Sequence, residues 1–487
     1  MSKKIILALS AALAIALCAA VLAACGGHPH ALTAHAAQAA GCTEAGNSAY
    51  WSCEVCGKYF ADAEGNTEIE EGSWVLEATG HTFADTWSFD EAAHWHAATC
   101  GHGEAAEREP HTFDGEMCTV CEYRADSTEG LAFLPSDDGQ SYVVAGIGTA
   151  EGADIVIPAQ YRELPVTGIV DSAFQGNAAI ESVFIPNSVT NLGWYAFADC
   201  TALRSVTMGS GVTLVGAAAF GGCTSLREVA LGENVATLGA NAFEGCTALQ
   251  NISLPASLAR IETYVFRDCT ALERIAIPRG AAEVMEGAFY NCTALESADL
   301  GGAEEIAAGV FYGCAALESL SLPASVARVG DYAFFGCASL KEIAVPAGAA
   351  SVGQYAFADC TALVSASLAD TVKSIGTGAF SGCAALKSVD LGGAEEMGLY
   401  AFEGCSSLTQ VVLPAGLTRV EEGAFSDCTA LKSVDMGSGV TEIGFMAFFG
   451  CTALEEIRFE GTAAQWNAIV KDPDWALGAG EIEIVYA

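Results

Sequence analysis

Residues 220–231 read FGGCTSLREVAL, and variants of this stretch recur along most of the chain at a fixed spacing. The cysteine of the stretch has counterparts 22 or 23 residues apart, at positions 200, 223, 246, 269, 292, 314, 337, 360, 383, 405, 428 and 451. One further step of 23 residues back from Cys200 reaches Asn177. Self-similarity at such a period is typical of repeat architectures. The chain is therefore expected to be built mainly from copies of one unit.

Two apolar positions keep the same register as the cysteine. A phenylalanine stands three residues before each of the thirteen positions, from Phe174 to Phe448. A leucine stands three residues after twelve of them, from Leu203 to Leu454, and Ile180 takes this place in the first unit. This agreement indicates that every unit contributes the same side chains to one shared core.

Each unit predicts a short strand followed by a turn. The consensus is V-x-x-I-x-x-x-A-F-x-x-C-x-x-L-x-x-V-x-L, and its end alternates apolar and polar residues, as in Leu226–Leu231. This alternation suits a strand with one face inward. No unit holds a periodic pattern long enough for a full helix, so the A-F-x-x-C part is expected to form at most one helical turn.

Stacking of these units predicts a solenoid. A coil of 22–23 residues cannot bury its own apolar edge, whereas stacked coils bury the edges of one another. We expect a β-rich leucine-rich-repeat solenoid of about 13 coils with stacked parallel strands, roughly 60 Å long at ~4.8 Å per coil. The repeats occupy residues 161–460, between an N-terminal cap at 126–160 and a C-terminal cap at 461–487.

Residues 155–459 resemble the BspA-type leucine-rich-repeat family of bacterial surface proteins. This resemblance implies the solenoid fold and an adhesin-like function, in which the protein contacts host proteins, other cells or matrix. The resemblance is specific for the fold and much less specific for the function.

The cysteine position is expected to hold a buried free thiol. The bend before the strand needs a small side chain that donates weakly to backbone carbonyl groups. Disulfides between coils are disfavoured because stacked residues have nearly parallel Cβ vectors about 4.8 Å apart, whereas a disulfide needs Cβ atoms ~3.8 Å apart and turned toward each other. Buried thiols are also poor metal ligands and nucleophiles.

The first residues predict export. Lys3 and Lys4 precede a run without charge from Ile5 to Ala24, so residues 1–24 are interpreted as a signal peptide. The end of this run, Leu22-Ala23-Ala24-Cys25, resembles the lipobox of bacterial lipoproteins. The resemblance implies a lipid on Cys25 and a cell-surface protein anchored to the membrane through that lipid. Ordinary cleavage near Ala37-Gln38-Ala39, which would secrete the protein, stays open. Residues 25–40 are expected to be a linker.

Residues 41–125 predict two small Cys/His modules that resemble zinc ribbons and hold structural zinc. Two Cys-x-x-Cys pairs have the spacing with which two thiolates bind one tetrahedral zinc ion. The candidate ligands are Cys42, Cys53, Cys56 and His81 for the first site and His96, Cys100, Cys118 and Cys121 for the second. His94, His102 and His111 are further candidates for the second site. Three disulfides, a redox Cys-x-x-Cys pair and a catalytic zinc ion stay open as alternatives.

Charge and residue types favour binding over catalysis. The formal net charge is −40, from 60 acidic residues and 20 Lys plus Arg. This charge opposes nucleic acid and anionic membrane surfaces as partners. No histidine follows His111, so a Ser-His or Cys-His catalytic pair is absent from the repeats. The expected partners are host or bacterial surface proteins.

Tyrosine recurs two residues before the phenylalanine and is the candidate contact for a protein partner. The five positions are Tyr195, Tyr264, Tyr332, Tyr355 and Tyr400. They could form a ridge suited to protein contact or simply cover the edge of the turns. Two other functions stay open: an envelope component that self-associates or binds wall polymer, and a zinc-dependent hydrolase based on residues 41–123.

Overall fold

The computed structural model describes residues 24–25, 28–29, 32–38, 40, 45–78, 83–89, 93–98, 105–110, 113–114, 117–118 and 127–486. The chain divides into two compact units, residues 1–83 and 84–487. Each unit is described by itself below.

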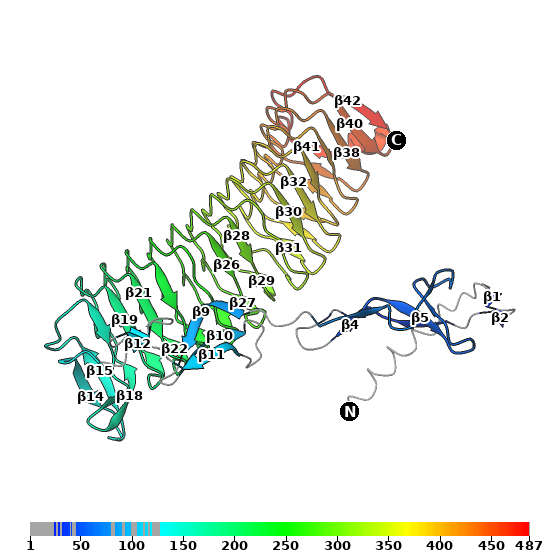
Figure 1. The fold of residues 1–487 in the computed structure, drawn as a ribbon. Coiled ribbons are helices and arrows are strands. Elements are labelled where there is room, and N and C mark those ends of the chain that lie inside the picture. The colour runs from blue at the N-terminus through cyan, green and yellow to red at the C-terminus, as the bar shows by residue number, and fades with distance from the viewer. Residues whose placement is uncertain are drawn as a thin grey trace, which may run out of the picture. The chain divides into compact units, whose positions relative to one another are not determined.

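The predicted strand of the repeat forms the first sheet of a solenoid (Figure 1). Its strands run parallel, and the register advances by one repeat at each step, so that Val183 pairs with Val206 and Val206 with Val229. The strands are β16 (Asp154–Val156), β19 (Ser182–Ile185), β21 (Ser205–Met208), β23 (Glu228–Ala230), β26 (Arg274–Ala276), β28 (Ser297–Asp299), β30 (Glu342–Val345), β32 (Ser365–Leu368), β34 (Ser388–Asp390), β36 (Gln410–Val412), β38 (Ser433–Gly437), β40 (Glu456–Glu460) and β42 (Glu483–Tyr486).

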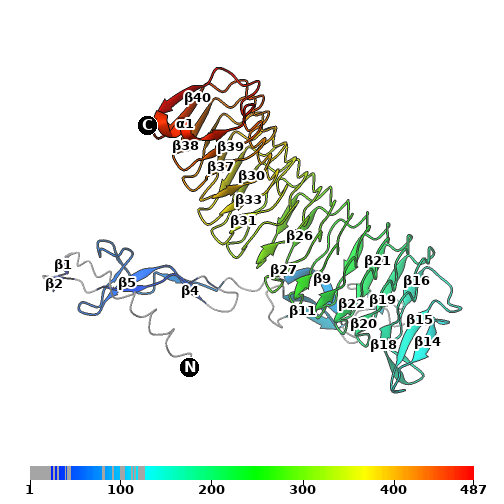
Figure 2. The same ribbon diagram turned by 180° about the vertical axis from the view of Figure 1, so that it is seen from behind.

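A second parallel sheet lines another side of the coils (Figure 2) and was not predicted from the sequence. Most of its strands are two residues long, which is too short to show a periodic pattern. Apart from β15 (Tyr142–Gly146) and β18 (Leu164–Ile169), they are β20 (Asn191–Leu192), β22 (Leu214–Val215), β24 (Thr237–Leu238), β25 (Arg260–Ile261), β27 (Glu283–Val284), β29 (Glu305–Ile306), β31 (Ser351–Val352), β33 (Ser374–Ile375), β35 (Glu396–Met397), β37 (Arg419–Val420), β39 (Glu442–Ile443) and β41 (Val470–Lys471).

The A-F-x-x-C stretch forms hydrogen-bonded turns, and its backbone also pairs between coils. The N–H group of Phe197 donates to the carbonyl of Ala219 over 2.7 Å, and that of Phe220 donates to Ala242 over 2.8 Å. In the part of the chain that the structure describes, the only α-helix is α1 (Ala463–Ala468) near the C-terminus. Backbone hydrogen bonds therefore join neighbouring coils along three sides.

The phenylalanines form the centre of the core. Phe197 and its counterparts through Phe448 are fully buried, and Phe174 in the first unit is 2% exposed. Consecutive rings are stacked with centroids 4.8 to 5.7 Å apart, as in the pairs Phe174–Phe197 and Phe243–Phe266. One apolar cluster runs from Leu131 to Ile469. The shared core predicted from the register is confirmed.

The ends extend the solenoid to about 15 turns, two more than the 13 expected. At the N-terminal end, β14 (Ala132–Pro135) pairs antiparallel with β15, and β17 (Gln160–Tyr161) pairs antiparallel with β18. At the C-terminal end, β41 and β42 continue the two sheets in parallel register. The ring of Trp475 covers that of Phe448 edge-on at 5.8 Å, which closes the core. Both segments expected as caps therefore contribute strands to the coils.

Among the described residues before 127, the strands form small antiparallel sheets. The first unit contains β3 (Leu32–His35), β5 (Tyr50–Cys53), β6 (Tyr59–Phe60) and β7 (Glu68–Ile69) in one sheet, beside the pairs β4 (Gly46–Asn47) with β8 (Val75–Leu76) and β1 (Ala24–Cys25) with β2 (His28–Pro29). β3 thus lies in the segment expected to be a linker. Further on are β9 (Phe83–Phe89), β10 (Ala93–Ala98) and β11 (Ala105–Pro110) in one sheet and the pair β12 (Phe113–Asp114) with β13 (Met117–Cys118). Among the described residues, no helix has the length and apolar character needed to cross a membrane.

Candidate binding surfaces

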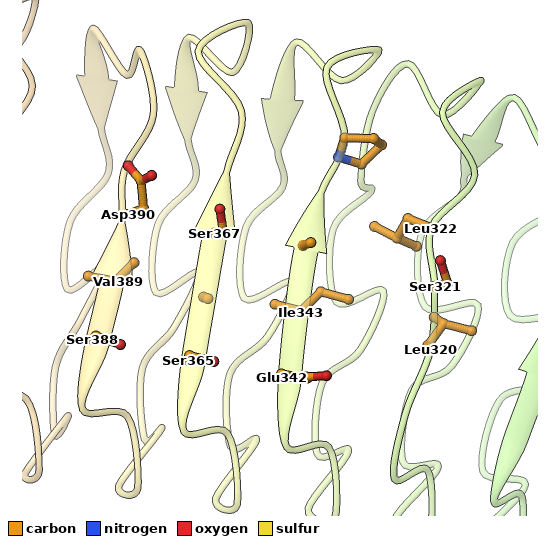
Figure 3. Close-up of a pocket in the computed structure, with 13 residues that line it drawn as sticks. Leu320, Ser321, Leu322, Glu342, Ile343, Ser365, Ser367, Ser388, Val389 and Asp390 are labelled. Carbon is orange, nitrogen blue, oxygen red and sulfur yellow. The ribbon is translucent and has the colours of Figure 1, made fainter. Parts of the chain in front are cut away.

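A hollow of about 720 Å³ lies on the first sheet, over strands β30, β32 and β34 (Figure 3). Side chains at alternate strand positions are exposed here and most of them are small, including Ser321, Ala344 and Ser367. Two carboxylates, Glu342 and Asp390, also line the hollow and are exposed. The small side chains leave room for the backbone of a partner to approach closely, while the hydroxyl and carboxylate groups offer hydrogen bonds.

The hollow begins where strand pairing is interrupted. The coil before β30 has no strand in the first sheet, and Ser319 makes only an isolated bridge to Ser297. A second hollow of about 540 Å³ lies beside residues 251–253, which also form no strand, and extends over β26 and β28. Both hollows therefore adjoin coils in which the first sheet is broken. The side chains that line them are apolar, hydroxyl, amide and charged groups.

The twelve solenoid cysteines are buried free thiols, as predicted. Each thiol donates to the carbonyl of the phenylalanine in the preceding coil over 3.1 to 3.2 Å, as Cys200 does to Phe174 and Cys223 to Phe197. Burial raises the pKa of Cys200 to about 11 and that of Cys314 to about 12. Thiols with such pKa values hold little thiolate at neutral pH, so the row is structural.

Asn177 takes the cysteine position of the first unit but bonds differently. It is half-buried, and its side-chain oxygen accepts from the N–H of Ala179 over 2.9 Å. Its hydrogen bond thus stays within its own turn, whereas the cysteines that follow bond to the coil before them.

The five predicted tyrosines all occupy the same backbone position, with φ between 50° and 57°. The structure brings only Tyr332 and Tyr355 together, in a stack with centroids 5.3 Å apart. Tyr264, Tyr355 and Tyr400 each lie over the glycine that holds this position in the next coil, where a Cβ atom would collide with the ring. Tyr195 and Tyr332 are 46% and 41% exposed. The five are therefore not one continuous ridge.

A second aromatic row was not predicted. Tyr290, Tyr312 and Phe335 each follow a core phenylalanine directly, in three consecutive coils. Their rings are stacked, with centroids 4.4 Å apart for Tyr290–Tyr312 and 4.8 Å for Tyr312–Phe335. Aromatic residues at one register position in three adjacent repeats are the sequence signal that points to this row.

The structure describes only part of the predicted zinc sites. Cys53 ends β5, Cys56 lies in the following turn, and Gly57 adopts a φ of 69°, which the tight knuckle turn requires. The N–H group of Gly57 donates to the carbonyl of Cys53 over 2.8 Å. His96 is half-buried in β10, and Cys118 ends β13. Four predicted ligands lie outside the described residues, namely Cys42, His81, Cys100 and Cys121.

The other candidates before the solenoid are also only partly described. His94 lies in β10, while His102 and His111 lie outside the described residues. Cys25, the predicted lipid attachment point, lies in β1, where it pairs with His28.

Comparison with known proteins identifies the repeat. The family model described as "BspA type Leucine rich repeat region" matches six copies at residues 167–300, 304–398 and 395–468, more than half of the chain. No curated protein matches the chain.

Two solved structures of bacterial leucine-rich repeat proteins are similar to this chain. A leucine-rich repeat protein from Bacteroides ovatus is 24% identical, covers 74% of this chain and 100% of its own, and superposes with a TM-score of 0.56, which shows the shared fold. A leucine rich cell surface protein from Faecalibacterium prausnitzii is 28% identical over 72% of this chain and 98% of its own, with a TM-score of 0.41. From the matched repeats, this chain belongs to the BspA-type leucine-rich-repeat proteins.

Proposed function

We propose that this chain is an exported cell-surface protein whose solenoid binds a partner protein. The hollow over β30, β32 and β34 carries this proposal. Its floor of half-buried and buried apolar residues, including Val389 and Ile343, is bordered by Ser365, Ser367 and Asp390. An apolar floor with polar groups around it is the usual anatomy of a protein interface. Extended solenoid surfaces of this kind serve as binding surfaces.

The residues of the hollow support binding over catalysis. The hydroxyl groups present are those of Ser321, Ser365, Ser367 and Ser388, and a serine nucleophile needs an adjacent general base. No histidine follows His111, so a Ser-His pair cannot form in the repeats. Glu342 and Asp390 lie on β30 and β34, with β32 between them. Carboxylates in this arrangement serve best as hydrogen-bond acceptors and as attractors of a basic partner.

Capture of a partner by the full mature chain tests this proposal. The chain would be immobilised and exposed to surface extracts of host cells and of bacteria. Ser367→Trp fills the hollow and should abolish capture, whereas Thr207→Trp, at the equivalent position of β21 outside both hollows, should not. Failure of the unaltered chain to capture any specific protein refutes the binding function. Equal capture by Ser367→Trp places the contact elsewhere, for which the five tyrosines are the next candidates.

The proposed cell-surface location depends on a lipid at Cys25. The small residues before this cysteine support it. Cys25→Ala should move the protein from the membrane fraction into the medium, as measured by immunoblotting after expression in a bacterial host. A protein that is found in the medium without this substitution is secreted instead.

Structural zinc is proposed for residues 41–125. The turn at Cys53-Glu54-Val55-Cys56-Gly57 supports it, since its hydrogen bond and the left-handed Gly57 hold the Cys-x-x-Cys pair in a knuckle. Elemental analysis of the purified full chain should find about two zinc ions, one for each predicted set of four ligands. Absence of zinc together with three disulfides in the mass spectrum would establish the alternative.

A further inference from the structure

One junction between neighbouring coils lacks strand pairing in both sheets. In the first sheet β34 pairs with β32 before it, whereas β36 begins a new group of paired strands. In the second sheet β35 pairs with β33, and β37 likewise begins a new group. The structure describes every residue of this stretch, and in it no backbone hydrogen bond joins residues 388–397 to residues 410–420. We name the junction between these two ranges the seam.

The coil before the seam is shorter than most of the others. Cys383 and Cys405 lie 22 residues apart, and the missing residue falls in the turn from the first sheet to the second. This turn, Leu391–Ala394, contains Gly392 with a φ of 56° and is one residue shorter than residues 413–417 of the next coil. Because a shorter turn changes how the two strands that it joins are placed, the strands of the full-length coil that follows cannot keep register with both of them.

The same turn sequence precedes a second place where the pairing of both sheets is weakened. Residues 299–305 and 390–396 both read DLGGAEE, and each stretch lies in a coil of 22 residues. After the earlier turn, each sheet continues into the next coil as an isolated bridge, such as that between Ile306 and Val329. The loss of pairing after both short coils supports the shortened turn as its cause.

Ion pairs do not replace the missing hydrogen bonds at the seam. They join neighbouring coils on either side of it, where Lys373 lies 3.0 Å from Glu395 and Arg419 lies 3.0 Å from Glu442. Both pairs stay on one side of the seam, and none of the ion pairs among the described residues 365–443 crosses it. The seam therefore also lacks the charge pairing that other junctions have.

The turns and the core still connect the coils across the seam. The N–H group of Phe402 donates to the carbonyl of Ala424 over 2.8 Å. The ring of Phe402 is stacked on that of Phe425, with centroids 5.4 Å apart. The backbone connection across the seam is therefore confined to the side of the coils that carries the turns.

We propose that the seam is a hinge, at which the coils from β36 to β42 bend as one body relative to the coils before them. The stability of a solenoid is a sum of contacts between neighbouring coils, so bending concentrates at the junction with the fewest. The hydrogen bonds between the turns form the axis, and the unpaired sheets open and close. The hollow ends at β34, directly before the seam, so a partner that extends past the hollow meets coils that can turn toward it. This inference goes beyond the proposed function, because the bending needs no partner.

Distances between two spin labels on the full chain, measured by double electron–electron resonance, test the hinge. The labels are attached to p-acetylphenylalanine, since the chain has cysteines of its own. The seam pair carries them at Ser351 on β31 and Glu442 on β39, on opposite sides of the seam. The control pair carries them at Leu214 on β22 and Glu305 on β29, the same number of coils apart within one unbroken sheet. None of the four side chains is buried.

An alanine inserted between Gly393 and Ala394 gives the coil before the seam its full length. The same insertion between Gly302 and Ala303, in the identical earlier turn, is the matched control. The seam pair should show a broader distribution of distances than the control pair, and the first insertion alone should narrow it. Hydrogen exchange adds a second measurement, in which the backbone amides of β36 and β37 should exchange on average about tenfold faster than those of β38 and β39. The first insertion should remove this difference.

Equal widths for the seam pair and the control pair in the unaltered chain would overturn the hinge, whether or not either insertion variant folds. A folded variant with the first insertion and an unchanged seam distribution would also contradict the proposal, because the short turn would then not cause the bending. Narrowing of the seam pair by both insertions alike would do the same. Thermal unfolding verifies that each variant is folded. Failure to capture a protein would refute the proposed function and leave the hinge standing.

Discussion

Replacing Phe334 with alanine should damage the solenoid at its middle. The ring of Phe334 is fully buried and lies between those of Phe311 at 5.4 Å and Phe357 at 5.1 Å. Because the neighbouring coils are held apart by their own backbone hydrogen bonds, they cannot collapse into the space that the ring leaves. The substitution therefore creates a cavity in the core.

The magnitude follows from burial and stacking. A buried Phe→Ala change costs about 3–5 kcal/mol of unfolding free energy. The substitution removes two stacked ring contacts, each worth ~0.5–1.5 kcal/mol. We therefore expect a loss of unfolding free energy at the upper end of the range for a buried Phe→Ala change. Phe174 at the first unit has one stacked partner, Phe197, and is 2% exposed. Phe174→Ala should therefore cost about 1 kcal/mol less.

Urea unfolding followed by circular dichroism, combined with hydrogen exchange read by mass spectrometry, measures both effects. The stability of a solenoid depends on contacts between neighbouring coils, so Phe334→Ala should also uncouple the coils before it from the coils after it. The backbone amides of these two halves should then lose their protection from hydrogen exchange at different urea concentrations. Phe174→Ala should leave the coils after the first unit unfolding together in one cooperative transition. If Phe334→Ala costs under about 1 kcal/mol, or if both variants unfold in one identical transition, the reasoning from the stacked core is wrong.

Three further predictions concern the thiols and the glycines. The twelve solenoid thiols should resist iodoacetamide at pH 8 and react fully in denaturant; mass spectra showing rapid labelling of the native chain would contradict their burial. Since folding raises the thiol pKa above its ordinary 9.0, the thiol contribution to stability is present below pH 9 and lost as pH rises toward about 11 at Cys200 and about 12 at Cys314. The thermal midpoint should therefore fall above pH 9 and less steeply in a Cys200→Ala, Cys314→Ala variant; equal slopes would be evidence against this linkage. Gly376→Ala should cost ~1–3 kcal/mol in urea unfolding, because its Cβ would lie 2.5 Å from the backbone nitrogen of Gln354, whereas Gly280→Ala, with 3.6 Å to the nearest atom, should be tolerated.

For residues 41–125, the sequence predicts the local Cys-x-x-Cys turn but not which residues complete each metal site. Spacing alone suggested the Cys-x-x-Cys knuckle, and the turn at Gly57 has the backbone geometry that such a knuckle needs. Whether Cys42 or His81 completes a site depends on how separate strands meet, and Cys-x-x-Cys spacing carries no information about that. The ligand sets therefore stay a prediction.

The five tyrosines within the solenoid are likewise predictable in position but not in contacts. Their shared position was visible in the sequence, but their role depends on the next coil. A ring such as that of Tyr264 or Tyr400 extends over the neighbouring repeat and covers a glycine there. The sequence pattern of one repeat does not show which residues of the next coil its side chains cover.

The period of 22 or 23 residues by itself determined the solenoid, its shared apolar core and the buried thiols, because every repeat turns the same side chains inward and stacked repeats bury the apolar edges of one another. Tertiary structure alone decided the second sheet and the hollows on the first sheet. Two-residue strands exist only as hydrogen bonds between coils. A hollow forms where pairing between adjacent coils is interrupted, as at residues 319–322. These features depend on how neighbouring coils pair in space, and the sequence pattern within one repeat does not encode that pairing.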